Sequence, residues 1–221
     1  AIKSAIREVA NEQAMAEMPE NENETISLML GDFAELSRTL ADESIDAIIT
    51  DPPYPYQYIE EWSRLSEMAM RVLKPGGWCI TYSGKQHLDE VMARMTTSGL
   101  EYFWQIVFLQ TTMATDHARG VNTQYKPILL FQKPPIRKPD TYFVDVIKGS
   151  GVEKDGHEWQ QSENGFVELM ERFTMAGETI MDPFLGSGTC AVAASKTARR
   201  FIGYEIDEGT YASACKRVFG G

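Results

Sequence analysis

The chain has 221 residues, 43% of them hydrophobic and 24% charged, which is typical of one globular domain with a substantial core. It has no apolar run near the roughly 20 residues that span a membrane and no secretory signal pattern, so we expect a cytoplasmic protein. Its three scattered cysteines are too few for a disulfide framework or a zinc cluster, so we expect no metal. The net charge of −11 excludes a generally basic nucleic-acid-binding surface, so any such binding requires a confined basic patch.

The first 24 residues differ in pattern from the rest of the chain. Residues 1–24 indicate an N-terminal helix and then a polar linker, a joint that leaves open a missing upstream domain. From residue 25 onward strand and helix patterns alternate, which predicts a parallel sheet with helices on both faces. The expected strands are 26–30, 47–50, 78–82, 179–181 and 200–204, and the expected helices are 33–40, 60–73, 87–95, 166–174, 190–197 and 211–218.

The segment from residue 102 to 160 interrupts this alternation. Two expected strands, 102–110 and 125–132, are separated by a polar segment, and their closeness in sequence predicts an antiparallel pair at one edge of the sheet. Residues 133–160 are rich in Pro, Gly and charge, which indicates a long loop with one short strand at 142–146.

A Gly-rich turn, residues 181–189, lies between the expected strand 179–181 and the helix 190–197. Gly186 and Gly188 let a ligand approach the exposed amides at the start of the helix. Glu205 follows at the end of the next strand, where a carboxylate can accept both hydroxyls of a ribose. The GxGxxG phosphate fingerprint is absent, and Asp182 repels a pyrophosphate but suits cationic ammonium and sulfonium groups. The turn therefore favours S-adenosylmethionine over NAD or ATP, with a tight packing turn as the alternative.

The tetrapeptide Asp51-Pro52-Pro53-Tyr54 directly follows the buried strand 47–50, and open α/β sheets bind ligands at the carboxyl ends of their strands. The two prolines remove two amide donors and leave carbonyl groups free to accept hydrogen bonds. Asp51 adds an acceptor and Tyr54 a flat face, so the group can hold an exocyclic NH2 and stack its ring. Taken alone, the four residues fit a polyproline-like turn with a surface tyrosine equally well.

Together these motifs resemble one known family. Asp-Pro-Pro-Tyr at 51–54, followed much later by Asp-Pro-Phe-Leu-Gly-Ser-Gly-Thr at 182–189 and Phe-Ile-Gly-Tyr-Glu-Ile-Asp at 201–207, is similar to the permuted (β-class) DNA amino-methyltransferases, in which the catalytic motif also comes first. The resemblance covers about residues 25–219. It implies a Rossmann-like class I methyltransferase fold, an α/β fold with a seven-stranded, mostly parallel sheet and one antiparallel edge strand, in a domain over residues 25–221.

The resemblance also implies roles for individual residues. The implied catalytic residues are Asp51, Pro52, Pro53 and Tyr54. The implied contacts to S-adenosylmethionine are Asp32, Asp51, Asp182, Phe184, Gly186, Ser187, Gly188, Thr189, Glu205 and Ile206, with Gln161 and Ser162 as polar groups for the methionine part. Residues 157–164 lack the Lys-Pro of the family's usual string before the helix at 166–174 and are longer than that string.

The expected macromolecular partner is DNA, whose target base must leave the stack to reach such a pocket. Candidate phosphate contacts are Arg119, Lys133, Arg137, Lys138 and Lys148, with a merely solvated loop as the alternative interpretation. We expect residues 133–160 to form a short target-recognition loop.

The resemblance therefore implies a DNA methyltransferase that acts on adenine N6, because the family's cytosine-N4 enzymes often carry Ser at the position of Asp51. The alternatives are methylation of cytosine N4 or of RNA bases, and a catalytically silent nucleic-acid-binding module. The intact motifs at 51–54 and 186–188 argue against the silent module. The recognition sequence, a restriction partner and a homodimer are left open.

Overall fold

The computed structural model describes residues 25–139, 141–149 and 163–220, together with Ala5 and Val9. The expected N-terminal helix and linker, and the cofactor contacts expected of Gln161 and Ser162, lie outside these residues.

The described strands are β1 (Ile26–Leu30), β2 (Ile45–Thr50), β3 (Leu73–Tyr82), β4 (Glu101–Asp116), β5 (Val121–Gln132), β6 (Val146–Lys148), β7 (Thr179–Asp182) and β8 (Arg200–Glu205). The described helices are α3 (Phe33–Leu36), α4 (Ile59–Val72), α5 (Leu88–Thr97), α6 (Glu163–Phe173), α7 (Thr189–Lys196) and α8 (Glu208–Phe219), with 3-10 turns η1 (Ser37–Thr39) and η2 (Tyr56–Tyr58).

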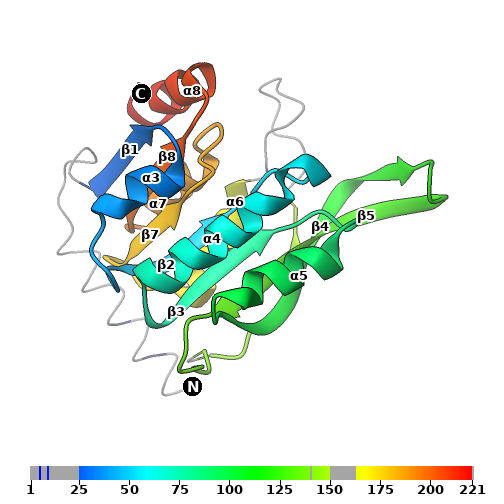
Figure 1. Cartoon of the computed structure of the whole chain (residues 1–221), viewed down its shortest axis with the longest axis horizontal. Helices are drawn as coiled ribbons and strands as arrows, with labels where there is room; N and C mark the ends of the chain where they lie inside the picture. Colours follow the sequence, from blue (N-terminus) through cyan, green and yellow to red (C-terminus); the bar gives the residue numbers. More distant parts are fainter. Residues whose placement is uncertain (1–4, 6–8, 10–24, 140, 150–162, 221) are drawn as a thin grey trace.

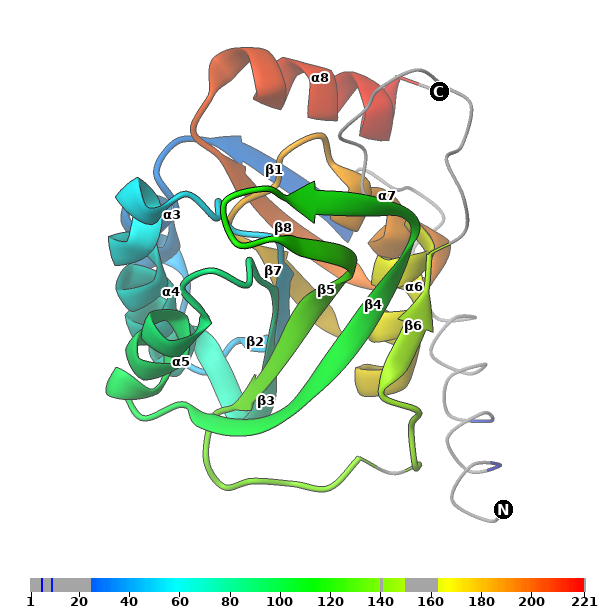
Figure 2. The ribbon, with the colours of Figure 1, turned by 90° about the vertical axis from the view of Figure 1, so that its right-hand side faces the viewer.

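One sheet forms the middle layer of the molecule, with α3, α4 and α5 on one face and α6 and α7 on the other (Figure 2). The side chains of β2 show why the sequence builds two cores, because successive residues of a strand point to opposite faces. Ile48 packs with α4 and α5, and Ile49 packs with α6 and α7. Both are fully buried, and each such side chain contributes roughly 1.5–3 kcal/mol to folding. None of the described helices is both long and apolar enough to span a bilayer.

The expected parallel sheet is confirmed, but its strand count and the place of its antiparallel strand were wrong. In the described residues the sheet has eight strands in the order β1-β8-β7-β2-β3-β5-β4-β6, and β5 alone runs antiparallel to its neighbours. Because β6 adds to β4, the antiparallel strand lies inside the sheet and not at its edge. The short strand expected at 142–146 begins at residue 146, where its backbone pairs with Val107 of β4.

The strands β4 and β5 are longer than expected and form a projecting hairpin (Figure 1). We call residues 109–125 the arm. The polar segment expected to be a loop is paired backbone, with Ala114 opposite Thr123 and Asp116 opposite Val121. The two strands satisfy each other's hydrogen bonds, so this ladder needs no apolar face against the core. Alternating hydrophobicity, the signal used to find strands, is therefore absent from the arm.

Candidate functional site

The site lies at the carboxyl ends of the parallel strands. β2 ends at Thr50 and β7 ends at Asp182, and these two strands are neighbours in the sheet. The Thr50 hydroxyl donates a 2.6 Å hydrogen bond to Asp182 Oδ1. Two motifs that are more than 120 residues apart in sequence, Asp51–Tyr54 and the turn 182–189, therefore start side by side.

Asp51 occupies a mostly enclosed position with two polar neighbours. The Tyr54 hydroxyl donates a hydrogen bond to Asp51 Oδ1, and Lys126 Nζ of β5 lies 3.8 Å from Asp51 Oδ2. Burial raises the pKa of the Asp51 carboxyl above its ordinary value, while the Lys126 charge and the Tyr54 hydrogen bond act in the opposite direction. Burial, followed by the Asp51 charge, raises the pKa of Tyr54. Tyr54 is therefore a neutral hydrogen-bond donor to Asp51.

The Gly-rich turn holds its shape through positive backbone angles and one carboxylate. Gly186 has φ +54° and Gly188 has φ +80°, a region that glycine adopts without steric cost. The amide of Gly186 donates to Glu205 Oε2 at 2.9 Å, and the amide of Asp207 donates to Glu205 Oε1 at 2.9 Å. Glu205 is thereby fixed beside the turn at the end of β8.

Two hydroxyl groups and one arginine tie the turn to the last helix. Arg217 Nη1 of α8 donates a 2.8 Å hydrogen bond to Thr189 Oγ1, and Ser187 Oγ lies 3.4 Å from the same oxygen. Ser187 and Thr189, two of the residues expected to contact the cofactor, therefore have partners within the protein. Nothing in the sequence pattern indicated Arg217.

Asp182 is a buried carboxyl at the mouth of the turn. Its pKa is raised to about 7, mainly by burial and to a smaller extent by the Asp51 charge, although hydrogen bonds from Thr50 and from the Phe184 amide lower it. A carboxyl with such a pKa changes charge near neutral pH. A cation bound next to it would keep it ionised.

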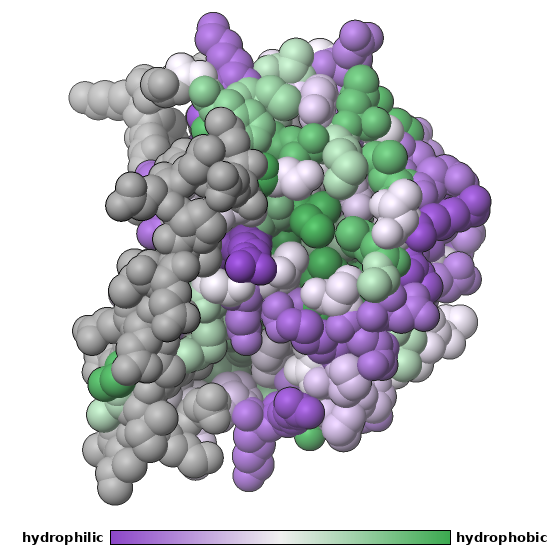
Figure 3. Space-filling view, turned by 90° about the vertical axis from the view of Figure 1, so that its left-hand side faces the viewer, coloured by the Kyte–Doolittle hydropathy of each residue, from purple (hydrophilic) through white to green (hydrophobic). Residues whose placement is uncertain are grey.

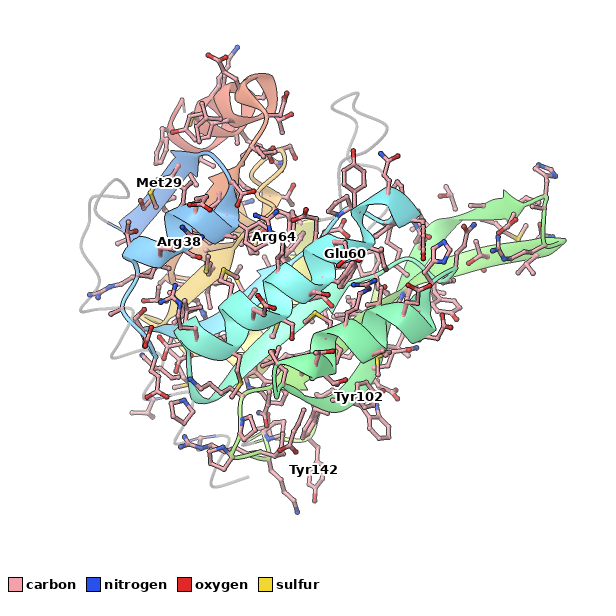
Figure 4. All side chains as sticks on the ribbon, viewed as in Figure 1. Met29, Arg38, Glu60, Arg64, Tyr102 and Tyr142 are labelled. Atoms are coloured by element: carbon pink, nitrogen blue, oxygen red, sulfur yellow. The ribbon has the colours of Figure 1, made fainter. Side chains whose placement is uncertain are left out.

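Asp32, for which the resemblance implied a cofactor contact, has partners within the protein. Its carboxylate caps α3 by accepting from the Ala34 amide at 2.8 Å, and both its oxygens accept from Arg64 Nη2 of α4 at 2.6 and 2.7 Å. Figure 4 shows Arg64 reaching from α4 toward the segment that follows β1. The Arg64 guanidinium also lies 5.1 Å from the ring centroid of Phe33. This arginine, which sequence reasoning missed, is 32 residues from Asp32, so no local pattern signals the pair.

Apolar groups surround the turn on the β1 side. The ring of Phe184 lies 4.9 Å from that of Phe33, centroid to centroid. Ile206, directly after Glu205, is 70% exposed, and Leu30 at the end of β1 is 43% exposed. Figure 3, which views the molecule from the side of β1 and α8, shows apolar side chains gathered over its upper part. An apolar ligand face therefore has surface to cover near Glu205.

The five expected phosphate contacts are not together. Lys133 is buried and its Nζ lies 3.0 Å from Glu43 Oε1, while its backbone pairs with Gly77 at the amino end of β3. Arg137 and Lys138 line a hollow of about 350 Å³ at the same end. These three residues lie at the end of the sheet opposite Asp51. Lys148 and Arg119 lie on the Asp51 side, at the end of β6 and at the tip of the arm.

A cleft of about 980 Å³ lies between the arm and the segment after β3. It is lined by Tyr54 and Lys126 beside Asp51, by residues 83–87 and by much of the arm. Lys85 Nζ lies 4.1 Å from the Tyr125 ring centroid, and the Gln86 side chain donates to Asp116 at 3.1 Å, so two contacts join the walls. Sequence reasoning overlooked Lys85, although it follows the end of an expected strand, where binding residues gather.

The polar groups of the site are not arranged as a metal centre. In residues 25–139, 141–149 and 163–220 no three His, Cys, Asp or Glu side chains are placed to hold a metal ion. What the described site offers to a ligand is a set of carboxylates, backbone amides, hydroxyls and rings.

Comparisons with known proteins agree with this geometry. A family model described as "DNA methylase" matches residues 145–216, and one described as "Methyltransferase domain" matches residues 4–81. The chain is 26% identical over 201 residues to the putative methylase YubD of Escherichia coli (strain K12), covering 85% of this chain and 88% of YubD.

Solved structures of DNA methyltransferases share the fold. The complex of M1.HpyAVI with SAM superposes with a TM-score of 0.72 at 22% identity, covering 88% of this chain and 99% of that protein. The PvuII DNA methyltransferase, described as cytosine-N4-specific, superposes with a TM-score of 0.77 at 16% identity, covering 87% and 86%. These likenesses confirm the expected methyltransferase fold.

Proposed function

We propose that this chain, a member of the S-adenosylmethionine-dependent DNA amino-methyltransferase family, transfers a methyl group to the N6 atom of adenine in DNA. The observation that carries the proposal is the Thr50–Asp182 hydrogen bond. It supports the proposal because Asp51, the proposed acceptor for the amine, follows Thr50, and the turn proposed for the cofactor starts at Asp182. The roles of individual residues below are part of this proposal.

The residues present fit S-adenosylmethionine. A side chain at Gly186 would meet nothing nearer than the Phe184 carbonyl oxygen at 3.9 Å, so the backbone there is open to a ligand. Glu205 stands at the end of β8 for the ribose, and Ile206 offers an apolar surface for the adenine. Asp182 is the anion for the charged methionine part. When bound, the cofactor supplies a methyl group on a sulfonium sulfur.

The protein's own residues position the amine and stabilise its charge. Asp51 Oδ2 accepts a hydrogen from the exocyclic NH2, because Oδ1 already accepts from Tyr54. The Pro52 carbonyl accepts the other hydrogen, and the Tyr54 ring stacks on the base. The nitrogen becomes positive as it attacks, so Asp51 stabilises the transition state more than the ground state. The positively charged nitrogen then loses a proton to water, so no strong general base is needed.

Adenine N6 is favoured over cytosine N4 by Asp51 at the first motif position, which often carries Ser in cytosine-N4 enzymes of the family. The likeness to the cytosine-N4-specific PvuII enzyme is one of fold at 16% identity and does not extend to the base. Digestion of methylated DNA to nucleosides and mass spectrometry separates the two products. N6-methyldeoxyadenosine is the expected product. Detection of N4-methyldeoxycytidine in its place would overturn the assignment to adenine.

The DNA is held along the cleft beside the arm. This cleft opens at Tyr54, and Lys85, Lys126 and Arg119 give it positive charge in a protein of net charge −11. Its tyrosine rings next to cations suit bases next to phosphates. The far hollow at Arg137 and Lys138 lies away from Asp51, at the opposite end of the sheet. We therefore assign the DNA to the arm side.

Replacing Asp51 tests the proposed chemistry. We expect Asp51→Ala to lower methyl transfer from tritiated S-adenosylmethionine to unmethylated plasmid DNA by about 100-fold or more, because the developing ammonium loses its acceptor. Cofactor affinity, measured by calorimetry, should change little. Asp42→Ala is the matched control, because Asp42 is an exposed carboxylate paired with Arg71 away from the site. An Asp51→Ala protein that transfers at the control rate would refute the assignment.

A further inference from the structure

Lys126 makes two contacts at the amine site. Its Nζ lies 3.8 Å from Asp51 Oδ2 and 5.4 Å from the ring centroid of Tyr54. Asp51 Oδ1 is occupied by the Tyr54 hydroxyl, so Oδ2 is the oxygen left for an incoming amine. The lysine therefore faces both groups that the target base is to use, the Asp51 oxygen and the Tyr54 ring.

The target base is proposed to contact the same two groups, the Asp51 carboxylate and the Tyr54 ring. An exocyclic amine donates to Asp51 while its ring stacks on Tyr54, and Lys126 presents an ammonium to the same carboxylate and the same ring. We propose that Lys126 is a placeholder that holds Asp51 and Tyr54 in position and is displaced from them when the target base enters. This inference rests on the proposed function.

The charge on the reacting nitrogen gives a reason for displacement. The amine nitrogen becomes positive as the new N–C bond forms, and an ammonium kept beside Asp51 would repel that charge. The distance of 3.8 Å is longer than a hydrogen bond, so no tight contact has to break. Lys126 is also 28% exposed at its side chain, which leaves it room to turn toward the cleft.

Before the base arrives, Lys126 compensates for the enclosure of Asp51. The titratable groups that act on the pKa of Asp51 are Tyr54 in its own loop and Lys126 of β5, and the Asp51 charge in turn raises the pKa of Tyr82 of β3 and of Asp182 of β7. Lys126 is the one cation among these described groups. Its charge favours the ionised carboxyl and so opposes burial, which raises the pKa of Asp51.

The test compares two pH profiles of methyl transfer to unmethylated plasmid DNA at saturating cofactor. The profile of kcat/KM reports the enzyme before DNA binds, and the profile of kcat reports the complex with DNA. In Lys126→Gln, the acid limb of kcat/KM should move up by about one pH unit, because a neighbouring cation lowers a carboxyl pKa by at least that amount. The acid limb of kcat should coincide with that of the wild type, since Lys126 has already left Asp51 in that complex.

Lys126→Arg is the conservative variant, and it should restore the wild-type limb of kcat/KM because it keeps the cation. A limb that shifts equally in kcat and kcat/KM would show that Lys126 stays on Asp51 with the base bound, and would overturn the inference. Limbs that do not move in Lys126→Gln would show that the lysine does not act on Asp51, which also overturns it. A wild-type protein without methyl transfer would instead remove the proposed function, and this inference with it.

Discussion

At the scale of single residues, Asp182 connects the fold to the chemistry. It ends β7, it is fully enclosed, and its partner Thr50 ends the strand that carries Asp51. A positive group beside a carboxyl in this place favours its ionised form. Burial raises its pKa to about 7, so in the protein alone the charged and neutral forms are close in free energy at neutral pH.

This pKa predicts how cofactor binding depends on pH. A cationic cofactor favours the ionised Asp182, so below pH 7 the carboxyl must lose a proton on binding, and affinity is weaker there. We expect the affinity of the wild type for S-adenosylmethionine to rise by up to about tenfold from pH 6 to pH 8. A tenfold change in affinity corresponds to about 1.36 kcal/mol of binding free energy.

Calorimetry on wild type and Asp182→Asn measures this dependence. The variant keeps the shape of the side chain but cannot ionise, so it should bind more weakly at pH 8 and lack the Asp182 part of the pH dependence. Titration of the cofactor's own groups is common to both proteins and cancels in the comparison. Equal pH profiles for the two proteins would mean that Asp182 does not face the charged part of the cofactor.

At the scale of elements, the turn between β7 and α7 uses its two glycines differently. A side chain at Gly188 would lie 3.2 Å from Val218 Cγ2 and 3.4 Å from Ala214 Cβ, so α8 packs directly on this residue. At Gly186 the nearest atom would be 3.9 Å away, in open space. Both residues have positive φ, where a side chain costs about 1–2 kcal/mol.

Alanine substitutions should separate these two uses. Gly188→Ala should lower the free energy of unfolding by more than Gly186→Ala, because it adds crowding against α8 to the backbone strain that both share. Gly186→Ala should weaken cofactor binding more, because its methyl group stands where the backbone is open to a ligand. Urea denaturation and calorimetry measure the two quantities. The opposite ranking in calorimetry would show that the ligand approaches from the Gly188 side, and the opposite ranking in urea would show that α8 does not crowd Gly188.

Elements with a strong repeating pattern were predictable from the sequence, and the others were not. β1 was found with its observed bounds, and α4 within one residue at each end, because apolar residues there recur at the period of the element. The arm was missed because its strands pair with each other and not with the core. The motifs of the site were found because each follows a buried strand. Arg64 was assigned no role, and Lys126, which belongs to the basic stretch considered for phosphate contacts, was not placed beside Asp51. Their partners are 32 and 75 residues away, and only the folded chain brings them together.

At the scale of the whole molecule, the two ends of the sheet carry different sets of charged residues. The carboxyl ends carry Asp51, the Gly-rich turn and the cleft beside the arm. The amino ends carry Lys133, whose charge is already paired with Glu43, and the hollow at Arg137. A protein of net charge −11 offers few places for a polyanion, so which end binds DNA has a measurable consequence.

Two double variants compare the ends directly. Arg119→Gln with Lys148→Gln removes two positive charges on the Asp51 side, and Arg137→Gln with Lys138→Gln removes two at the opposite end. If DNA lies along the arm, the first pair should reduce the slope of log affinity against log salt by up to about 0.9 for each phosphate that is no longer neutralised, and the second should leave it unchanged. Cofactor affinity should be unaltered in both, because none of the four residues lies at the Gly-rich turn.

The two pairs are well matched because all four residues are basic and lie outside the proposed chemistry. Arg119 is held by an exposed ion pair with Asp116, 3.3 Å long, which a phosphate can replace at small cost. Titration of fluorescent duplex DNA at several salt concentrations gives the slopes. If only the Arg137 and Lys138 pair lowers the slope, the DNA crosses the amino ends of the strands. The target base would then have no short path to Asp51, and the arm would need another role.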